Sequence, residues 1–258
     1  MRRRALGQHF LRDAGIARSI VDLLAPTPAD LVVEIGPGQG ALTAELSRRA
    51  GRVVALEVDR ALSARLRVAL PAVEVLDVDA RAWDWSSLAR PAGGGALVVG
   101  NLPYSVGTNI LVALARAPQA IDRIVVMLQR EVAERVAAAP GGKTYGSLSV
   151  HVQLRWRVEL AMRVLPGAFR PPPKVESAVL RLTPLPAPPV ELADEPRFEA
   201  VVRAAFAQRR KTLVNALAKG LGLPVGAARE AAASAGVDPG RRAETLDIRE
   251  FAEVARRL

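Results

Sequence analysis

The chain has 258 residues, of which 50% are hydrophobic and 24% are charged, so it is long and apolar enough to bury a core. This composition excludes a disordered or collagen-like chain. The 36 Lys and Arg residues outnumber the 26 Asp and Glu residues, and the net charge of +10 favours a polyanionic partner, with nucleic acid ahead of a membrane surface. A coding bias toward arginine is the alternative explanation.

The cysteines, the histidines and the long apolar segments of the sequence narrow the class of protein further. The chain has no cysteine, which excludes disulfides, thiolate metal sites and cysteine nucleophiles and is typical of a reducing compartment. Its two histidines, His9 and His151, are far apart in the sequence, so we expect no metal site. No stretch approaches the roughly 18 apolar residues of a membrane span, and no signal-peptide core follows Arg2–Arg4. We therefore expect a cytoplasmic protein that does not enter a membrane.

The first half of the chain predicts strands that alternate with helices. Asp13 is a candidate cap for an amphipathic helix over residues 13–25. Five short apolar runs then predict strands, and helical spacing follows the first two of them: 31–35, 53–58, 73–76, 96–99 and 121–128. Strands that alternate with helices form crossover units, so we predict an α/β fold with a mostly parallel sheet covered on both faces.

The next segment is less regular. Residues 148–154 alternate apolar and polar side chains as a strand does, but the surrounding topology favours a helix, and we predict a helix there. Two further strands are predicted at 158–164 and 177–182. Between them lies the proline-rich segment 166–173, whose consecutive prolines favour an extended backbone.

A proline-rich linker at 183–189 predicts a domain boundary. After it, apolar residues recur every three or four positions and glycine and proline breaks separate them, which predicts a small all-helical domain. We therefore divide the chain into a first domain, 1–186, and a second domain, 187–258.

A glycine turn follows the first predicted strand and opens a helix. The turn, at residues 36–40, lets a ligand approach the backbone beside a helix N-terminus of positive potential. Glu57, 21 residues after Gly36, ends the second predicted strand, a position at which a carboxylate accepts hydrogen bonds from ribose hydroxyls. Asp79 follows the third predicted strand, where an acceptor for an adenine amino group is expected. This pattern predicts a cofactor that contains adenosine. A nicotinamide dinucleotide and a glycine turn that binds no ligand are the alternatives for the pattern, and a helix cap is the alternative for Asp79.

The tetrapeptide Asn101-Leu102-Pro103-Tyr104 directly follows the run at 96–99. The amino group of an adenine is a poor nucleophile because its lone pair is delocalised into the ring, so a catalyst must accept hydrogen bonds from its protons. The Asn101 side-chain carbonyl and the Leu102 backbone carbonyl are two such acceptors. Pro103 restricts the backbone, and Tyr104 offers a ring on which a flipped base can stack.

With this tetrapeptide the chain resembles the ribosomal RNA adenine dimethyltransferases, and within them the bacterial small-subunit (16S) enzymes more than the antibiotic-resistance relatives. His9 stands where many family members carry asparagine. The resemblance runs nearly end to end and rests on blocks at 7–13, 33–43, 57–59, 101–104, 129–135, 145–150, 169–175 and 206–213.

The resemblance implies a Rossmann-like class I S-adenosylmethionine-dependent methyltransferase sheet at 1–186 and a helical rRNA-binding domain at 187–258. It implies S-adenosylmethionine as the donor and two adjacent adenosines in the 3′-terminal hairpin loop of 16S rRNA as the target, each methylated twice at N6 by a monomer on the immature 30S subunit. The cofactor residues implied are His9, Leu11, Gly36, Gly38, Glu57, Asp79 and Asn101.

The resemblance also implies a substrate site. Tyr104 and Phe169 would sandwich the flipped base, although Phe169 is alternatively a core aromatic beside a proline turn. Arg209, Arg210 and Lys211, together with Arg12 and Arg2–Arg4, are candidates for contacts with rRNA phosphates, and a solvated face is the alternative for each cluster.

Three other functions remain open. A 23S rRNA adenine methyltransferase that confers macrolide resistance is disfavoured by the block Gln208–Leu213. A ribosome-assembly factor without catalysis is disfavoured by the intact block 101–104. A nicotinamide oxidoreductase would have no use for Asn101.

Overall fold

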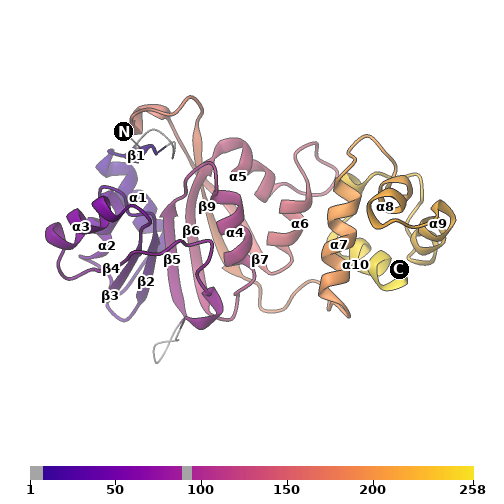
Figure 1. The fold of residues 1–258 in the computed structure, drawn as a ribbon, viewed down its shortest axis with the longest axis horizontal. Coiled ribbons are helices and arrows are strands. Elements are labelled where there is room, and N and C mark those ends of the chain that lie inside the picture. The colour runs from indigo at the N-terminus through magenta and orange to yellow at the C-terminus, as the bar shows by residue number, and fades with distance from the viewer. Residues whose placement is uncertain (1–7, 89–94) are drawn as a thin grey trace. The chain divides into compact units, whose positions relative to one another are not determined.

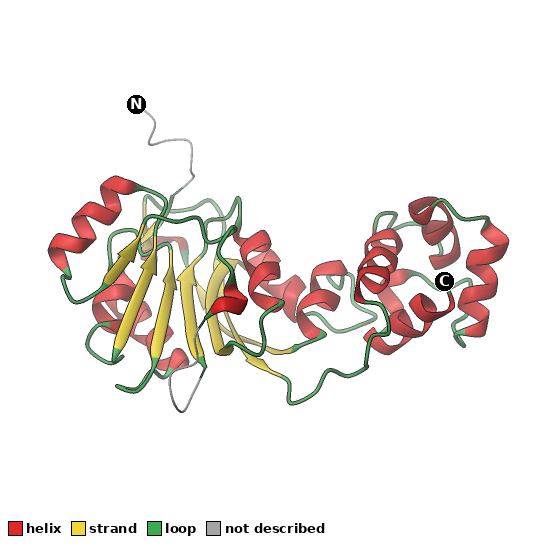
Figure 2. Ribbon diagram, turned by 60° about the horizontal axis from the view of Figure 1, so that its bottom comes forward, coloured by secondary structure: helices red, strands yellow, loops and turns green. Residues whose placement is uncertain are grey.

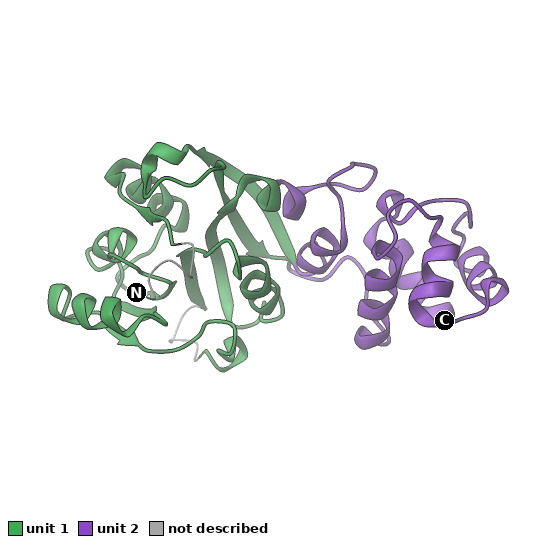
Figure 3. Cartoon of the chain, turned by 45° about the horizontal axis from the view of Figure 1, so that its top comes forward, with its two compact units in different colours: residues 1–133, 156–185 green, residues 134–155, 186–258 purple. Residues whose placement is uncertain are grey.

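The computed structural model describes residues 8–88 and 95–258, so Arg2–Arg4 lies outside the described residues. The chain forms two compact units (Figure 3). The sheet unit comprises residues 1–133 and 156–185, and the helical unit comprises 134–155 and 186–258. The last crossing between the units lies between Leu185 and Pro186. The segment 134–155 packs with the helical unit although two strands of the sheet follow it in the chain.

The sheet unit contains a seven-stranded sheet in the order β4-β3-β2-β5-β6-β9-β7 (Figure 1). The first five of these strands are parallel, as predicted, and the last two are antiparallel to their neighbours. Their bounds are β2 (Leu31–Ile35), β3 (Arg52–Leu56), β4 (Glu74–Leu76), β5 (Ala96–Asn101), β6 (Ile121–Gln129), β7 (Trp156–Val164) and β9 (Ser177–Pro184). The strand predicted at 53–58 thus ends at Leu56, and Glu57 belongs to the following loop.

Helices cover both faces of this sheet (Figure 2), which explains why β2 is buried at all five positions. The predicted cap of the first helix is confirmed, because Asp13 Oδ1 accepts hydrogen bonds from Gly15 N at 2.8 Å and Ile16 N at 3.0 Å. The helices are α1 (Ala14–Leu24), α2 (Ala41–Leu46), α3 (Arg60–Ala69), α4 (Gly107–Ala115) and α5 (Arg130–Ala137), with 3-10 turns at Trp85–Ser87 and Pro166–Ala168.

A two-stranded sheet joins the beginning of the chain to the proline-rich segment. Strand β1 (Phe10–Leu11) pairs antiparallel with β8 (Phe169–Arg170), so that Phe10 lies opposite Arg170 and Leu11 opposite Phe169. The pairing brings residues from before the first helix to the region that follows β7. We call residues 8–13 the strap, because this short segment is held against 168–171 across the end of the sheet unit.

The helical unit confirms the helical pattern predicted after the linker. Its apolar core includes Phe198, Leu213, Leu217 and Phe251, which come from three different helices. Residues 148–154 lie in a helix and its C-cap, as predicted, and contribute Val150 to the same core. The helices are α6 (Ser147–Gln153), α7 (Glu195–Phe206), α8 (Leu213–Leu221), α9 (Val225–Ser234) and α10 (Ile248–Arg257), with a 3-10 turn at Ala243–Thr245. In the part of the chain that the structure describes, no helix meets the length and apolarity of a membrane span.

Candidate active site

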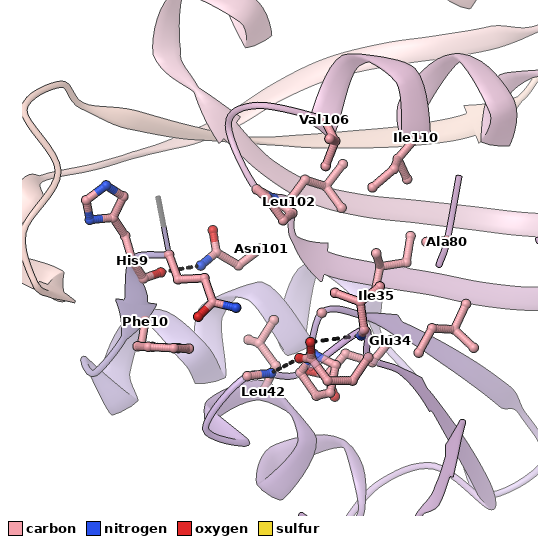
Figure 4. Close-up of a pocket in the computed structure, with 18 of the residues that line it drawn as sticks. His9, Phe10, Glu34, Ile35, Leu42, Ala80, Asn101, Leu102, Val106 and Ile110 are labelled. Carbon is pink, nitrogen blue, oxygen red and sulfur yellow. Dashed lines mark hydrogen bonds between the residues drawn. The ribbon is translucent and has the colours of Figure 1, made fainter. Parts of the chain in front are cut away.

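A pocket opens at the carboxyl ends of β2, β3, β4 and β5, the edge at which ligands bind in parallel sheets. Its lining comes from the strap and from the loops that follow these four strands (Figure 4). Ten predicted site residues line it: His9, Leu11, Gly36, Gly38, Glu57, Asp79, Asn101, Leu102, Pro103 and Tyr104. Phe169, Arg209, Arg210 and Lys211 do not. The structure thus brings the predicted cofactor and catalytic residues together.

Asn101 ends β5, and its side chain has a defined orientation. Nδ2 donates a hydrogen bond to the backbone carbonyl of His9 at 3.0 Å (Figure 4). A carbonyl oxygen only accepts, so this contact assigns the amide nitrogen to the strap and leaves Oδ1 as the acceptor available to a ligand. The next peptide is also held, because Leu102 N donates to Met127 O at 3.0 Å.

The strap that orients Asn101 is itself anchored to residues 168–171. Arg12 N donates to Ala168 O at 2.8 Å, in addition to the β1–β8 pairing. His9 Nδ1 bonds to Pro171 O at 2.8 Å, and since the carbonyl cannot donate, the proton lies on Nδ1. The side chain of His9 therefore fixes the strap, while its backbone carbonyl fixes Asn101.

Tyr104 presents a ring at the pocket. Its hydroxyl forms a hydrogen bond of 2.7 Å with Ser177 Oγ, and its ring centroid lies 5.6 Å from that of His9. Burial raises the pKa of the Tyr104 hydroxyl, so this group stays protonated. Phe169, by contrast, is 4% exposed and packs in the core of the sheet unit. In this structure Phe169 is thus a core aromatic, and Tyr104 alone of the two rings lines the pocket.

Two carboxylates hold the loops of the pocket. Glu57 is buried, and its Oε2 accepts from Gly38 N at 3.1 Å while Oε1 accepts from Val58 N and Asp59 N at 3.0 Å. The carboxylate thereby ties the glycine turn to the end of β3. Asp79 is held by a residue that sequence reasoning missed, since Arg81 donates to it through the backbone N at 2.9 Å and through Nε.

The Asp79–Arg81 contact has two effects. The guanidinium of Arg81 holds the pKa of Asp79 below its usual range, so that the carboxyl stays ionised. Arg81 also lines the pocket and brings a positive charge to it. The predicted alternative for Asp79 is a helix cap, but the residues that follow it form a turn, and Asp79 lines the pocket.

The family model described as ribosomal RNA adenine dimethylase matches residues 1–258. The chain belongs to the ribosomal RNA adenine dimethylase family. Two similar proteins carry the name ribosomal RNA small subunit methyltransferase A. The one from Geobacter metallireducens is 45% identical over 99% of this chain and 95% of its own length. The one from Acidobacterium capsulatum is 49% identical over 98% of this chain and 90% of its own length.

Among solved structures, the 23S rRNA methyltransferase ErmE is 28% identical, covers 96% of this chain and 99% of its own, and superposes with a TM-score of 0.70. The fold expected from the resemblance, a class I methyltransferase sheet followed by a helical part, is confirmed. The tetrapeptide 101–104, on which the predicted resemblance rests, begins at the last residue of β5.

The pocket contains a third carboxylic acid, Glu34 on β2, which the sequence analysis did not predict as a site residue. Its side chain is 1% exposed, and Oε2 has no hydrogen-bond partner among the described residues. Burial raises the pKa of Glu34 from 4.5 to about 8, with a smaller contribution from the negative charge of Glu57, while the hydroxyl of Thr43 acts in the opposite direction. The signal was present in the sequence as one acidic residue within an apolar strand that leads into the glycine turn.

Three of the predicted phosphate contacts lie in the helical unit, on the turn after α7. Arg209, Arg210 and Lys211 are exposed. The guanidinium of Arg209 donates to the backbone carbonyl of Lys143, another exposed cation. Four basic side chains thus come from two segments of this unit. Within residues 8–88 and 95–258, no group of three His, Asp or Glu side chains forms a candidate metal site.

The glycine turn yields a first prediction. Gly36 and Gly38 both have positive φ, at 64° and 56°, so alanine at either position should cost about 1–2 kcal/mol of unfolding free energy. A Cβ at Gly38 would also lie 2.9 Å from the Phe10 ring, whereas one at Gly36 would have its nearest neighbour at 4.0 Å. We expect Gly38→Ala to destabilise more than Gly36→Ala in urea unfolding. Equal losses would show that Phe10 does not pack on this turn.

Glu34 yields a second prediction. Its folded pKa lies above its unfolded value, so the folded state binds more protons between about pH 5 and pH 8 and loses stability as the pH rises through that range. Glu34→Gln removes this loss and should be more stable than wild type at pH 8, with the difference shrinking toward pH 5. Urea unfolding across this range measures both proteins. Glu45→Gln, which changes a carboxylate paired with Arg48, should show no such gain, and an equal gain there would contradict the assignment.

Proposed function

We propose that this chain transfers methyl groups from S-adenosylmethionine to N6 of two adjacent adenosines in the 3′-terminal hairpin loop of 16S rRNA and dimethylates each. Family membership supports an rRNA adenine as the target, and the small-subunit name of relatives at 45% and 49% identity supports 16S rRNA. The single observation that carries the proposal is the hydrogen bond from Asn101 Nδ2 to His9 O, which leaves Oδ1 as an acceptor at the pocket.

The chemistry of the pocket suits this donor. S-adenosylmethionine is a cation with a ribose and an adenine, and it supplies an electrophilic methyl group on its sulfonium. We assign the ribose hydroxyls to Glu57 and the adenine amino group to Asp79, since both carboxylates line the pocket at the ends of adjacent strands. His9, Leu11, Gly36, Gly38 and Asn101 complete the cofactor set. The absence of a Cβ at Gly38 lets the Phe10 ring lie against the turn.

The residues of 101–104 act on the adenine amino group. Asn101 Oδ1 and the Leu102 carbonyl accept hydrogen bonds from its two protons and favour a pyramidal nitrogen whose lone pair is directed at the methyl group. Pro103 restricts the turn, and the ring of Tyr104, held through Ser177, stacks on the flipped base. The nitrogen becomes acidic once it has given up its electron pair, so its proton leaves without a histidine base.

The helical unit would bind the rRNA. Arg209, Arg210 and Lys211 are exposed cations on one turn, and Arg12 lies on the strap beside the pocket, so both positions suit contacts with phosphates. We propose that Phe169, which packs in the core of the sheet unit, does not stack on the base. We further propose that the chain acts as a monomer in the cytoplasm on the immature 30S subunit.

Transfer of tritiated methyl groups tests this function. Particles of 30S that lack the modification should accept label, and mapping should place it on N6 of the two adjacent adenosines. Naked 23S rRNA serves as the second substrate, because the likeness to ErmE makes it the competing target. Label on a 23S adenine and none on 30S particles would overturn the proposal.

The role of Asn101 gives a third prediction. Asn101→Ala removes one of the two acceptors, so methyl transfer should be lost, whereas binding of S-adenosylmethionine should stay within about tenfold, a difference of about 1.4 kcal/mol. Calorimetry measures the binding and a single-turnover assay measures the transfer. Near-normal turnover of this variant would refute the assigned role.

A further inference from the structure

Glu34 occupies a position in the donor pocket that the proposed reaction does not use. It is the fourth of the five residues of the otherwise apolar strand β2 and lines the pocket with the glycine turn (Figure 4). Its side chain is 1% exposed, yet Oε2 lacks a hydrogen-bond partner among the described residues. A buried polar atom without a partner costs free energy, so its retention in a ligand pocket points to a ligand that satisfies it.

The charges around Glu34 do not compensate a carboxylate there. Glu57, which directly follows the neighbouring strand β3, is itself acidic. In the pocket Asp79 is held by Arg81, and outside it the acid of α2, Glu45, is paired with Arg48. Across residues 8–88 and 95–258, no Lys or Arg forms an ion pair with Glu34, and His9 bonds to Pro171.

This arrangement makes the protonation of Glu34 depend on the ligand. An isolated buried carboxylate is costly, so the acid stays neutral, consistent with its pKa of about 8 in the free protein. A positive charge a few ångström away favours the ionised form and lowers the pKa again. The methyl donor of the proposed reaction carries such a charge on its sulfonium and another on its amino group.

We propose that Glu34 is a proton-exchanging cation site, neutral in the free protein and ionised once the positively charged methyl donor enters. The O–H bond of the acid breaks, the proton passes to the buffer, and the carboxylate compensates the charge of the ligand. This inference rests on the proposed function, because it takes S-adenosylmethionine as the donor. It assigns to β2 a role in the charge balance of the pocket, separate from the contacts of Glu57 and Asp79.

Isothermal titration calorimetry of the full chain with S-adenosylmethionine tests the inference. Titrations at pH 7 in buffers of different ionisation enthalpy give the number of protons released on binding. Wild type should release close to one proton per bound donor, and its dissociation constant should fall about tenfold between pH 6 and pH 7, as expected when a proton competes with the ligand at a group of pKa about 8.

Two variants isolate the contribution of Glu34. Glu34→Gln keeps the shape of the neutral acid but cannot ionise, so the proton release and the tenfold pH dependence should both disappear. Glu45→Gln is the matched control and should release as many protons as wild type, since Glu45 lies outside the pocket and is paired with Arg48.

A second ligand identifies the charge that Glu34 meets. S-adenosylhomocysteine keeps the amino group but has a neutral sulfur, so proton release with both ligands assigns the amino group, and release with S-adenosylmethionine alone assigns the sulfonium. Binding of S-adenosylmethionine to wild type without proton release, or equal release by Glu34→Gln, would overturn the inference and leave the donor assignment intact. Failure of wild type to bind S-adenosylmethionine would overturn the proposed function itself.

Discussion

The hydrogen bond between the Asn101 amide and the His9 carbonyl is the contact on which the rest of the candidate site depends. An amide side chain has one donor end and one acceptor end, so the partner of Nδ2 decides which atom is left for a ligand. The His9 carbonyl keeps its place because the strap is paired with 168–171 and because the His9 ring bonds to Pro171. The reactive end of the pocket is therefore held by two segments from opposite ends of the sheet unit's sequence. Such preorganisation lets acceptor groups act on a substrate without reorganising during the reaction.

The charge of the pocket differs in sign from the charge of the chain. The protein carries a net charge of +10, whereas the pocket contains three carboxylic acids, Glu34, Glu57 and Asp79, beside one arginine. These charges serve different partners, because the field of the whole protein acts on a large polyanion and local groups act on a small ligand. Residues 190–258 hold 12 Lys and Arg against 10 Asp and Glu, so most of the excess lies earlier in the chain. A positively charged donor and a negatively charged RNA can thus be attracted to one protein.

The three acids also show how carboxyl groups in one pocket meet three different environments. Glu57 accepts three backbone hydrogen bonds, Asp79 is paired with Arg81, and one oxygen of Glu34 lacks a partner. Each carboxyl sits at or near the end of a parallel strand, where the sheet topology brings the strand ends together. Hydrogen bonding and a cation favour the ionised form, and burial without either favours the neutral acid. The environment of each acid, and not its place in a motif, therefore determines its charge.

The sequence by itself determined the features that depend on near neighbours in the chain. These include the alternation of strands and helices, the Asp13 cap, the glycine turn, and the edge at which residues 57, 79 and 101 meet. Only the tertiary structure decided that Phe169 belongs to the core, that 134–155 packs with the helical unit, and that Glu34 lacks a partner in the pocket. Hydrophobic period and turn chemistry are local properties and can be read along the chain. Burial, the orientation of the Asn101 amide and the pKa of an acid are set by atoms from segments far apart in the sequence, which no local pattern specifies.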